Sequence, residues 1–359
     1  MKKRMLYICH VDWNWIKQRP HFLAERLADQ FDIRVLYAYQ NRHRDTLQKR
    51  AGEQITPYPL YRLPMAGRIP TIGAIADKLL KWQFVRHLNR HKPDCVFFTY
   101  PDQVNLLPKN YTGKVIYDCM DNHAEMQSLD HRKQQIQAQE KQLLTRADVV
   151  LVTSQRLMDV LVERYGEKHL EKMILVRNGY NGALLAADST ESPTKDFFEI
   201  SYFGTISHWF NFDFILKSLE EFPKLRYKII GPADAQLPQA DRIRYPGTVE
   251  HHKLFDAIKD TDCLIMPFRL NQIILAVDPV KLYEYINFNK NILTVRYDEI
   301  ERFSPFVHFY TDYESFRNQI QAMMEDNTLK YTSQQREEFL WENSWDARVQ
   351  TIVSAIDSL

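Results

Sequence analysis

Short apolar runs recur along the chain, and each is followed by a segment with the spacing of an amphipathic helix. In the first half we interpret these runs as buried strands, at Arg4–His10, Ile33–Ala38, Asp94–Tyr100, Lys114–Cys119, Asp148–Thr153 and Met173–Arg177. The alternation resumes in the second half, at Glu199–Phe203, Tyr227–Ile230, Ile243–Tyr245, Cys263–Pro267 and Ile292–Val295. Continuously apolar strands that alternate with helices predict parallel sheets covered on both faces.

A polar stretch over residues 181–196 interrupts this pattern and predicts a linker. With 359 residues, the chain is long enough for two domains. We therefore predict an α/β protein of two doubly wound, Rossmann-like domains, over residues 1–185 and 186–342. Residues 343–359 form a final amphipathic helix, which we expect to pack back on the first domain. Ligands in such folds bind beyond the carboxyl ends of the strands, here in a cleft between the domains.

Composition and charge narrow the class of protein. Hydrophobic residues make up 45% of the chain and charged residues 26%, which is typical of a globular protein. Four scattered cysteines argue against a disulfide scaffold. The amino-terminal apolar run is too short for a signal peptide, and no apolar window has the length of a membrane span, so we expect a cytoplasmic protein.

The net charge of +1 conceals an asymmetry between the halves. Residues 1–180 carry 29 Lys and Arg against 19 Asp and Glu, while the remainder carries 18 against 27. The first domain is thus basic, which predicts an anionic partner. No basic and aromatic nucleic-acid motif accompanies it, so we expect no nucleic acid and favour an anionic membrane surface or a phosphorylated lipid.

Two strands of the second half end at a glycine, Gly204 in Phe203-Gly-Thr205 and Gly231 in Ile230-Gly-Pro232. A glycine at this place either makes the turn or lets a phosphate or sugar approach the backbone amides. Two such ends in one domain favour a shared ligand edge.

The segment Asp278–Ile286 (DPVKLYEYI) suits the start of a helix, with Pro279 in its first turn. Free amides at a helix start attract a phosphate, and Lys281 adds a positive charge for a diphosphate. Glu284 shares that helix face and is suited to accept hydrogen bonds from ribose hydroxyls. Alternatively, Lys281 and Glu284 form only a surface ion pair.

Several motifs together resemble the GT-B glycosyltransferases of the family 4 type that build bacterial cell-envelope polysaccharides, including teichuronic-acid-type transferases. They occur in order over nearly the whole chain. The motifs are WNWIKQRPHFLA (Trp13–Ala24), YDCMDNH (Tyr117–His123), ADVVLVTSQRL (Ala147–Leu157), VRNGYN (Val176–Asn181), Phe203-Gly-Thr205, PGTVEHHKL (Pro246–Leu254), CLIMPF (Cys263–Phe268), DPVKLYEYI and NSWDARV (Asn343–Val349).

This resemblance implies a nucleoside diphosphate-sugar donor bound in the second domain. Lys281 and Arg269 would hold the diphosphate and Glu284 the ribose, and the loop after Gly247 would hold the base. The residues implied for the donor are Gly204, Thr205, Val249, Glu250, Arg269, Pro279, Lys281 and Glu284. The chain departs from the family at Ala276, where a first glutamate belongs, and Asp278 is the nearest carboxylate.

The first domain should supply the acceptor site and any acid–base group. Asp118 and Asp121 follow a strand and His123 lies two residues on. A sugar transferred with inversion needs a base to take the proton of the acceptor hydroxyl, and Asp121 is our first choice, before His123 and Asp118. A retaining transfer would need none, and Asp118 is equally suited to cap the next helix.

The loop after the first strand gathers further candidates for the acceptor. Arg19 is suited to a phosphate, and Trp13 and Trp15 are suited to stack on a sugar or sit against lipid. Asp12 belongs to the same cluster. Core packing of one indole and a solvated arginine are the alternatives.

Between Tyr61 and Lys92 lie seven Lys and Arg residues, Arg68 among them, and one acid, interleaved with apolar residues such as Trp82. Such a segment is suited either to an anionic bilayer or to packing on its own domain. No metal-ligand spacing occurs, and the resemblance implies no cofactor and no metal.

The sequence thus predicts a glycosyltransferase with a cell-surface polysaccharide or lipid-linked acceptor. We expect it in the cytoplasm, with the inner face of the cytoplasmic membrane as a further place. The alternatives are a sugar-nucleotide 2-epimerase of the same fold and, because of Ala276, a catalytically degenerate scaffold subunit.

Overall fold

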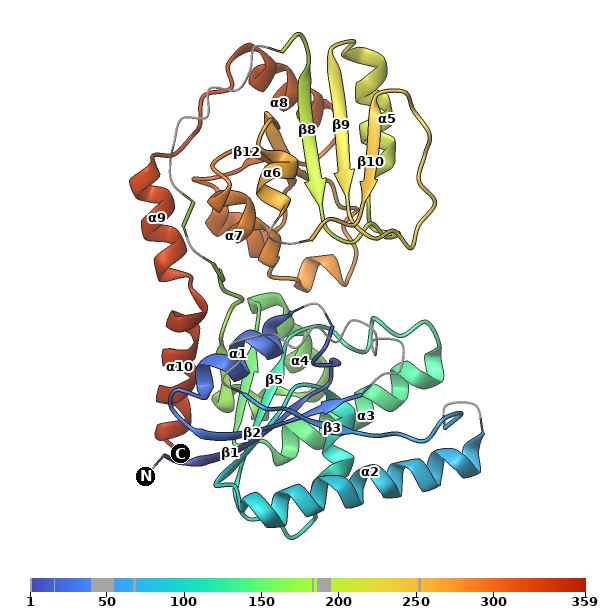
Figure 1. Ribbon diagram of the computed structural model, residues 1–359, viewed down its shortest axis with the longest axis vertical. Coiled ribbons are helices and arrows are strands. Elements are labelled where there is room, and N and C mark those ends of the chain that lie inside the picture. The colour runs from blue at the N-terminus through green and yellow to red at the C-terminus, as the bar shows by residue number, and fades with distance from the viewer. Residues whose placement is uncertain are drawn as a thin grey trace. The chain divides into compact units, whose positions relative to one another are not determined.

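The computed structural model describes residues 2–15, 17–39, 55–66, 69–182, 184–185, 195–250 and 253–359. Arg68, the two histidines of the PGTVEHHKL motif and linker residues 186–194 lie outside the described residues. The chain forms two compact units, one of Met1–Asn178 with Trp345–Leu359 and one of Gly179–Ser344 (Figure 1).

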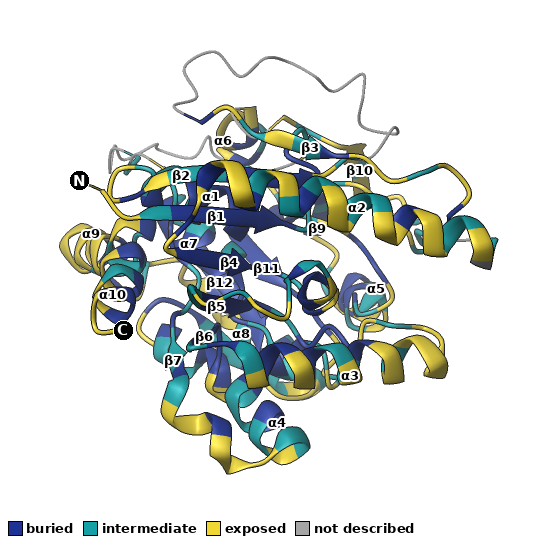
Figure 2. Cartoon of the chain, turned by 90° about the horizontal axis from the view of Figure 1, so that it is seen from below, coloured by how far each residue is buried: buried dark blue, intermediate teal, exposed yellow. Residues whose placement is uncertain are grey.

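The first unit is built on a seven-stranded parallel sheet with the order β3-β2-β1-β4-β5-β6-β7. The strands are β1 (Arg4–Cys9), β2 (Asp32–Ala38), β3 (Tyr58–Leu60), β4 (Cys95–Phe98), β5 (Lys114–Cys119), β6 (Val149–Val152) and β7 (Met173–Leu175). The helices are α1 (Arg19–Leu27), α2 (Pro70–His91), α3 (Asp130–Arg146), α4 (Gln155–Tyr165) and α10 (Trp345–Asp357). Figure 2 shows the central strands buried, as the apolar runs predicted.

The last helix, α10, belongs to the first unit. Trp345 is completely buried and its ring stacks on Phe22 of α1 with centroids 5.5 Å apart. Tyr180 lies where the chain first enters the second unit. Its backbone N–H donates to the carbonyl of Asn343 (2.8 Å), and its hydroxyl accepts from the side-chain amide of Asn287 (2.6 Å). These bonds join Tyr180 to the second unit, and the units change at residue 178 rather than at the expected residue 185.

The second unit has a six-stranded parallel sheet with the order β10-β9-β8-β11-β12-β13. The strands are β8 (Phe198–Phe203), β9 (Leu225–Ile230), β10 (Ile243–Gly247), β11 (Cys263–Met266), β12 (Asn291–Val295) and β13 (His308–Tyr310). The helices are α5 (Phe212–Glu221), α6 (Leu254–Ile258), α7 (Val280–Asn287), α8 (Tyr313–Glu325) and α9 (Ser333–Glu342). In chain order this is the 3-2-1-4-5-6 sequence of a doubly wound nucleotide-binding sheet.

Two strands escaped the sequence analysis, β3 and β13. Each has three residues and lies at the edge of its sheet. Pro59 in β3 suits an edge, because proline cannot donate to a second neighbour. Pro59 in β3 and His308 in β13 interrupt these short runs, whereas the equally short β7 is continuously apolar and was predicted. None of the helices in the described part of the chain is long and apolar enough to span a membrane.

Candidate functional site

The switch point of the first sheet lies between β1 and β4, and His10 and Thr99 follow these strands. The Thr99 hydroxyl donates to the carbonyl of Ile8 (2.9 Å), so its oxygen can only accept from Nδ1 of His10 (2.9 Å). His10 therefore carries its proton on Nδ1 and presents a lone pair on Nε2. Burial, with a smaller effect of His21, lowers the pKa of His10 to about 4, so its ring is neutral at pH 7.

His123 completes an aromatic cluster at this edge. Its ring lies 4.7 Å from that of Tyr100 and 6.0 Å from that of His10, between centroids. Burial and the neighbouring His10 lower the pKa of His123 to about 3. Its Nε2 is buried with no hydrogen-bond partner among the described residues. The structure thus places a second neutral imidazole beside the first.

Asp118 and Arg19, predicted for catalysis and for the acceptor, are each other's partners. The Arg19 guanidinium lies 2.8–3.1 Å from the carboxylate oxygens of Asp118 and also donates to the carbonyl of Arg177 (3.1 Å). Both side chains are almost fully buried: that of Arg19 is 3% exposed and that of Asp118 is 0% exposed. An acceptor phosphate would have to open this pair to reach Arg19, so the geometry gives both residues the task of joining α1 to β5.

Asp121 lies beyond β5 and is half-buried. Burial raises its pKa to about 7; Arg19 lowers it and the Asp118 carboxylate raises it further. A carboxyl group that titrates near neutral pH is suited to take and return a proton. The residues after it are anchored from α4, because Arg164 donates to Asn122 (3.2 Å) and pairs with the buried Glu140 (3.4 Å).

The loop after β1 separates the predicted acceptor residues. The buried carboxylate of Asp12 accepts from the backbone (3.0 Å) and side chain (3.1 Å) of Asn14, which fixes a turn. Trp13 is buried and packs on His21 with ring centroids 4.7 Å apart. Trp15 is 38% exposed. The structure therefore puts one indole in the core and leaves the other at the surface.

In the second unit, three glycines end the neighbouring strands β8, β9 and β10. Gly204, Gly231 and Gly247 have φ angles of 137°, 140° and 77°, which other residues rarely adopt. Gly204 donates its N–H to Ile230 (2.9 Å) and Gly231 donates to Gly247 (2.8 Å). A Cβ on Gly231 would lie 2.0 Å from the carbonyl oxygen of Gly204. We call Gly204, Gly231 and Gly247 the glycine ledge.

Lys281 of α7 lies over this ledge at Gly204. A Cβ on Gly204 would lie 1.9 Å from Cε and 2.8 Å from Nζ of Lys281, so a side chain there would displace the end of the lysine. Lys281 and Glu284 are half-buried, whereas the residues between them are buried. Burial lowers the pKa of Lys281, and Glu284 opposes this. Pro279 is the N-cap residue, one place before the helical position expected for it.

The remaining predicted donor residues lie on nearby loops of the same unit. Thr205 is exposed after β8, and Val249 and Glu250 follow β10, where Glu250 pairs with Lys253 (2.9 Å). Arg269, after β11, pairs with Asp213 (2.7 Å) on the exposed surface.

Position 276, where the resemblance implies a first glutamate, is buried. Ala276 is 2% exposed in a short 3-10 helix, Ile274–Ala276. Asp278 is also buried, and its carboxylate binds Arg302 and Tyr283. Asp278 therefore does not supply the carboxylate that the resemblance implies at position 276.

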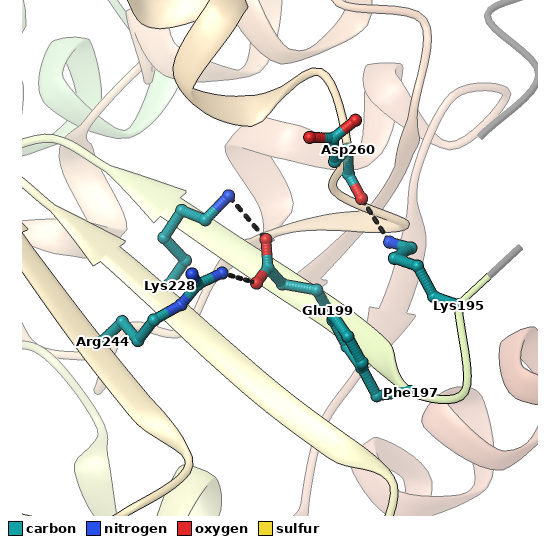
Figure 3. Close-up of a pocket in the computed structure, with 6 residues that line it drawn as sticks. All are labelled: Lys195, Phe197, Glu199, Lys228, Arg244 and Asp260. Carbon is teal, nitrogen blue, oxygen red and sulfur yellow. Dashed lines mark hydrogen bonds and ion pairs between the residues drawn. The ribbon is translucent and has the colours of Figure 1, made fainter. Parts of the chain in front are cut away.

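A cavity of about 290 Å³ lies elsewhere in the second unit, near the starts of β8 and β10 (Figure 3). Glu199 bridges Lys228 (2.6 Å) and Arg244, and Lys195 pairs with Asp262 (2.7 Å). Lysines also donate to carbonyls at the end of α6, among them that of Ala257. These pairs occupy the cavity's cations, so we assign it a structural role.

Sequence analysis missed Thr99, Tyr100 and Arg302. The first two end the predicted strand Asp94–Tyr100 and directly follow the observed β4, so their place at the carboxyl edge was available as a signal. Arg302 had no such signal, because it lies 24 residues from its partner Asp278. Among the described residues no three His, Cys, Asp or Glu side chains are grouped to hold a metal.

Neither a family model nor a curated protein matches the sequence. Solved structures do match over the whole length. Sucrose-phosphate synthase from Thermosynechococcus elongatus has a TM-score of 0.73 at 12% identity, covering 99% of both chains. Anabaena HepE in complex with UDP-glucose has 0.71 at 12% identity, covering 99% of this chain and 100% of that one.

A third match is the putative UDP-N-acetylglucosamine 2-epimerase from Listeria monocytogenes. It covers 100% of this chain and 96% of that one, with a TM-score of 0.55 at 10% identity. The first two structures match this chain better than the third, over the full length of its two α/β units. The fold predicted from the sequence is thereby confirmed: the chain has the GT-B fold.

Proposed function

We propose that this protein is a glycosyltransferase that moves a sugar from a nucleoside diphosphate donor to an acceptor hydroxyl. The observation that carries the proposal is the glycine ledge with Lys281 over it at the start of α7. Backbone without Cβ atoms, a helix start and one cation together form a site for a diphosphate. That the structure of HepE holds UDP-glucose on a similar fold supports this choice.

The chemistry follows from these groups. The acceptor oxygen bonds to the anomeric carbon of the sugar while the bond from that carbon to the diphosphate oxygen breaks. The electron pair leaves with the nucleoside diphosphate, and Lys281 and the α7 amides stabilise its charge. Glu284 accepts from the ribose hydroxyls. For an inverting transfer we assign Asp121 to remove the acceptor proton, since its pKa of about 7 suits a base.

We further propose that the acceptor is lipid-linked or polysaccharide and is met at the inner face of the cytoplasmic membrane. The supporting feature is the outer face of α2, where Trp82 (57% exposed) and Ile75 (59% exposed) lie among exposed Lys78, Lys81 and Arg86. Figure 2 shows this face of α2 largely exposed. Apolar side chains among cations are what an anionic bilayer binds.

Nucleotide binding and turnover test the reaction. Calorimetry against uridine and guanosine diphosphates, followed by donor hydrolysis or transfer assays, should show binding that Lys281→Ala and Glu284→Ala weaken. Lys224→Ala, an exposed lysine of the same unit, is the control and should bind like the parent. A parent protein that binds no nucleoside diphosphate would reject the transferase and favour a scaffold subunit.

The 2-epimerase is the second candidate, and the match to the Listeria monocytogenes structure supports it more weakly. Incubation with a donor and no acceptor separates the two, because an epimerase alone yields an isomerised nucleotide sugar. Binding to anionic vesicles, reduced by Trp82→Ser with Lys81→Ser, tests the membrane proposal independently.

A further inference from the structure

The start of α7 has no cap of its own. Its N-cap residue is Pro279, and no side chain caps the first turn locally. A helix start that carries an anion site must nevertheless be held in place, because its amides and Lys281 act only in one orientation. The contacts that fix the start of α7 come from the 3-10 helix Asp298–Phe303, which follows β12.

Arg302 of that 3-10 helix reaches the residue just before the cap. Its Nη2 donates to Oδ1 of Asp278 and to the hydroxyl of Tyr283 (2.7 Å). The Tyr283 hydroxyl donates in turn to Oδ2 of Asp278 (3.3 Å). Asp278 precedes α7 and Tyr283 lies within it, so the three groups form a triangle across the helix start.

Two further contacts hold this triangle. The guanidinium of Arg302 lies over the ring of Phe303, 4.0 Å from its centroid, which limits its tilt. The hydroxyl of Tyr297 donates to the carbonyl of Val277 (3.2 Å). The segment that leads into α7 is thus bound at both its side chains and its backbone.

Stability alone is a poor explanation of this arrangement. The Asp278 side chain is fully buried and that of Arg302 is 21% exposed. Burying both charges costs desolvation, so apolar residues of similar volume often serve a fold equally well. A guanidinium fork differs from an apolar contact because it fixes direction, here toward a carboxylate and a phenol at once.

Lys281 lies at this same start of α7, three residues after Asp278. The end of its side chain lies where a Cβ on Gly204 would be. The position of the helix start therefore decides where the lysine lies relative to Gly204.

We propose that Arg302 is a positioning residue of the donor site, which fixes the start of α7 through Asp278 and Tyr283 and thereby places Lys281 over the glycine ledge. The inference rests on the proposed function. It assigns to a buried ion pair the task of ordering this end of the site, close to Ala276, where the resemblance implies a glutamate.

The test compares nucleotide binding with stability in the full-length protein. Arg302→Met should weaken the binding of uridine diphosphate about tenfold or more and raise the donor KM more than it lowers kcat. Arg302→Lys keeps the charge without the fork and should recover only part of this. Tyr283→Phe removes one corner of the triangle, keeps the ring, and should give a smaller loss.

Two controls distinguish positioning from general destabilisation. Arg296→Met breaks an exposed pair with Glu301 beside the same 3-10 helix and should bind like the parent. Ile320→Ala lowers the melting temperature from the core of the same unit and should leave the dissociation constant unchanged below melting. Because Asp278 and Arg302 act as one unit, Asp278→Asn combined with Arg302→Met should bind no worse than Arg302→Met alone.

The outcomes separate the two proposals. If the parent binds the nucleotide and Arg302→Lys and Tyr283→Phe bind it within twofold of the parent, the positioning role is overturned and the transferase stands. If the core control weakens binding as much as Arg302→Met at equal melting temperature, the role is likewise overturned. If the parent binds no nucleoside diphosphate, the proposed function fails and this inference fails with it.

Discussion

The carboxyl edges of the two sheets are built from different materials. The edge of the first unit consists of side chains, His10, His123 and Asp121, whose pKa values burial moves far from their ordinary ranges. The edge of the second unit consists of backbone, three glycines of which Gly204 lies under Lys281. Proton transfer needs titratable groups with altered pKa values, while an anion needs amides and space. One fold thus provides both chemistries by changing the residues placed directly after its strands.

The largest effect should come from the ion pair that supports the first edge. Arg19→Met leaves the Asp118 carboxylate buried without its cation, which should cost about 3–5 kcal/mol of unfolding free energy. Urea unfolding measures this. Arg317→Met breaks an exposed pair with Glu221 and should cost below about 1 kcal/mol. Equal losses in the two variants would show that the buried pair does not hold the edge.

At the carboxyl edge of the second sheet, substitution of a glycine should lower the unfolding free energy. Gly231→Ala puts a methyl group 2.0 Å from the Gly204 carbonyl oxygen and should cost about 2–3 kcal/mol. Gly247→Ala is the matched control, because its φ is also positive but, apart from its chain neighbours, no atom of the described residues lies within 4 Å of the new methyl group. Strain alone should then cost about 1–2 kcal/mol. A cost for Gly247→Ala as large as for Gly231→Ala would contradict the close approach.

The pH dependence of stability distinguishes the groups of the first edge by sign. His10 and His123 have folded pKa values near 4 and 3, below the ordinary 6.5, so protonation favours the unfolded chain. Their contribution to stability is lost as the pH falls from 6.5 toward 3. Asp121, with a pKa near 7 instead of 3.8, contributes stability at low pH that is lost as the pH rises from 4 to 7.

Unfolding free energies at several pH values check both signs. On acidification from pH 6.5 to 5, His123→Gln should lose less stability than the parent protein, and Asp121→Asn should lose more. Asp121→Asn should also remove the rise of transfer rate through pH 7 if the transfer is inverting. Identical slopes in all three proteins would refute the altered pKa values.

The smallest effect should come from Arg269, whose pair with Asp213 is exposed on both sides. Asp213→Ala should change the unfolding free energy by below about 1 kcal/mol. If Arg269 binds the diphosphate, Arg269→Ala weakens nucleotide binding while Asp213→Ala leaves it intact or strengthens it. Equal binding by both variants and the parent would remove Arg269 from the donor site.

The parts of the molecule that sequence predicts are those encoded locally. Gly204 and Gly231 each follow an apolar strand, and Lys281 and Glu284 share one short helix, so local spacing was enough to single them out. Gly247 was indicated only by the resemblance. The two doubly wound sheets follow from the same local alternation. A three-residue edge strand is found only where it is continuously apolar, as β7 is; β3 contains a proline and was missed.

The partners that decide the state of those residues are distant in sequence. Arg19 and Asp118 are 99 residues apart, so no pattern announces that two candidate functional residues neutralise each other. Trp13 and Trp15 look alike in the sequence, yet only packing against His21 decides which one is buried. Likewise, the tautomer of His10 depends on the hydroxyl of Thr99, which is 89 residues away in the sequence.

The membership of α10 in the first unit has a consequence for synthesis on the ribosome. Phe22 on α1 packs on Trp345, which is translated only after every residue of the second unit. Until then this contact of α1 cannot form. The later-made unit can therefore mature first, while the earlier-made one keeps an apolar seam open until the chain is almost finished. A nascent chain halted near residue 344 would be the form most exposed to chaperones and proteases.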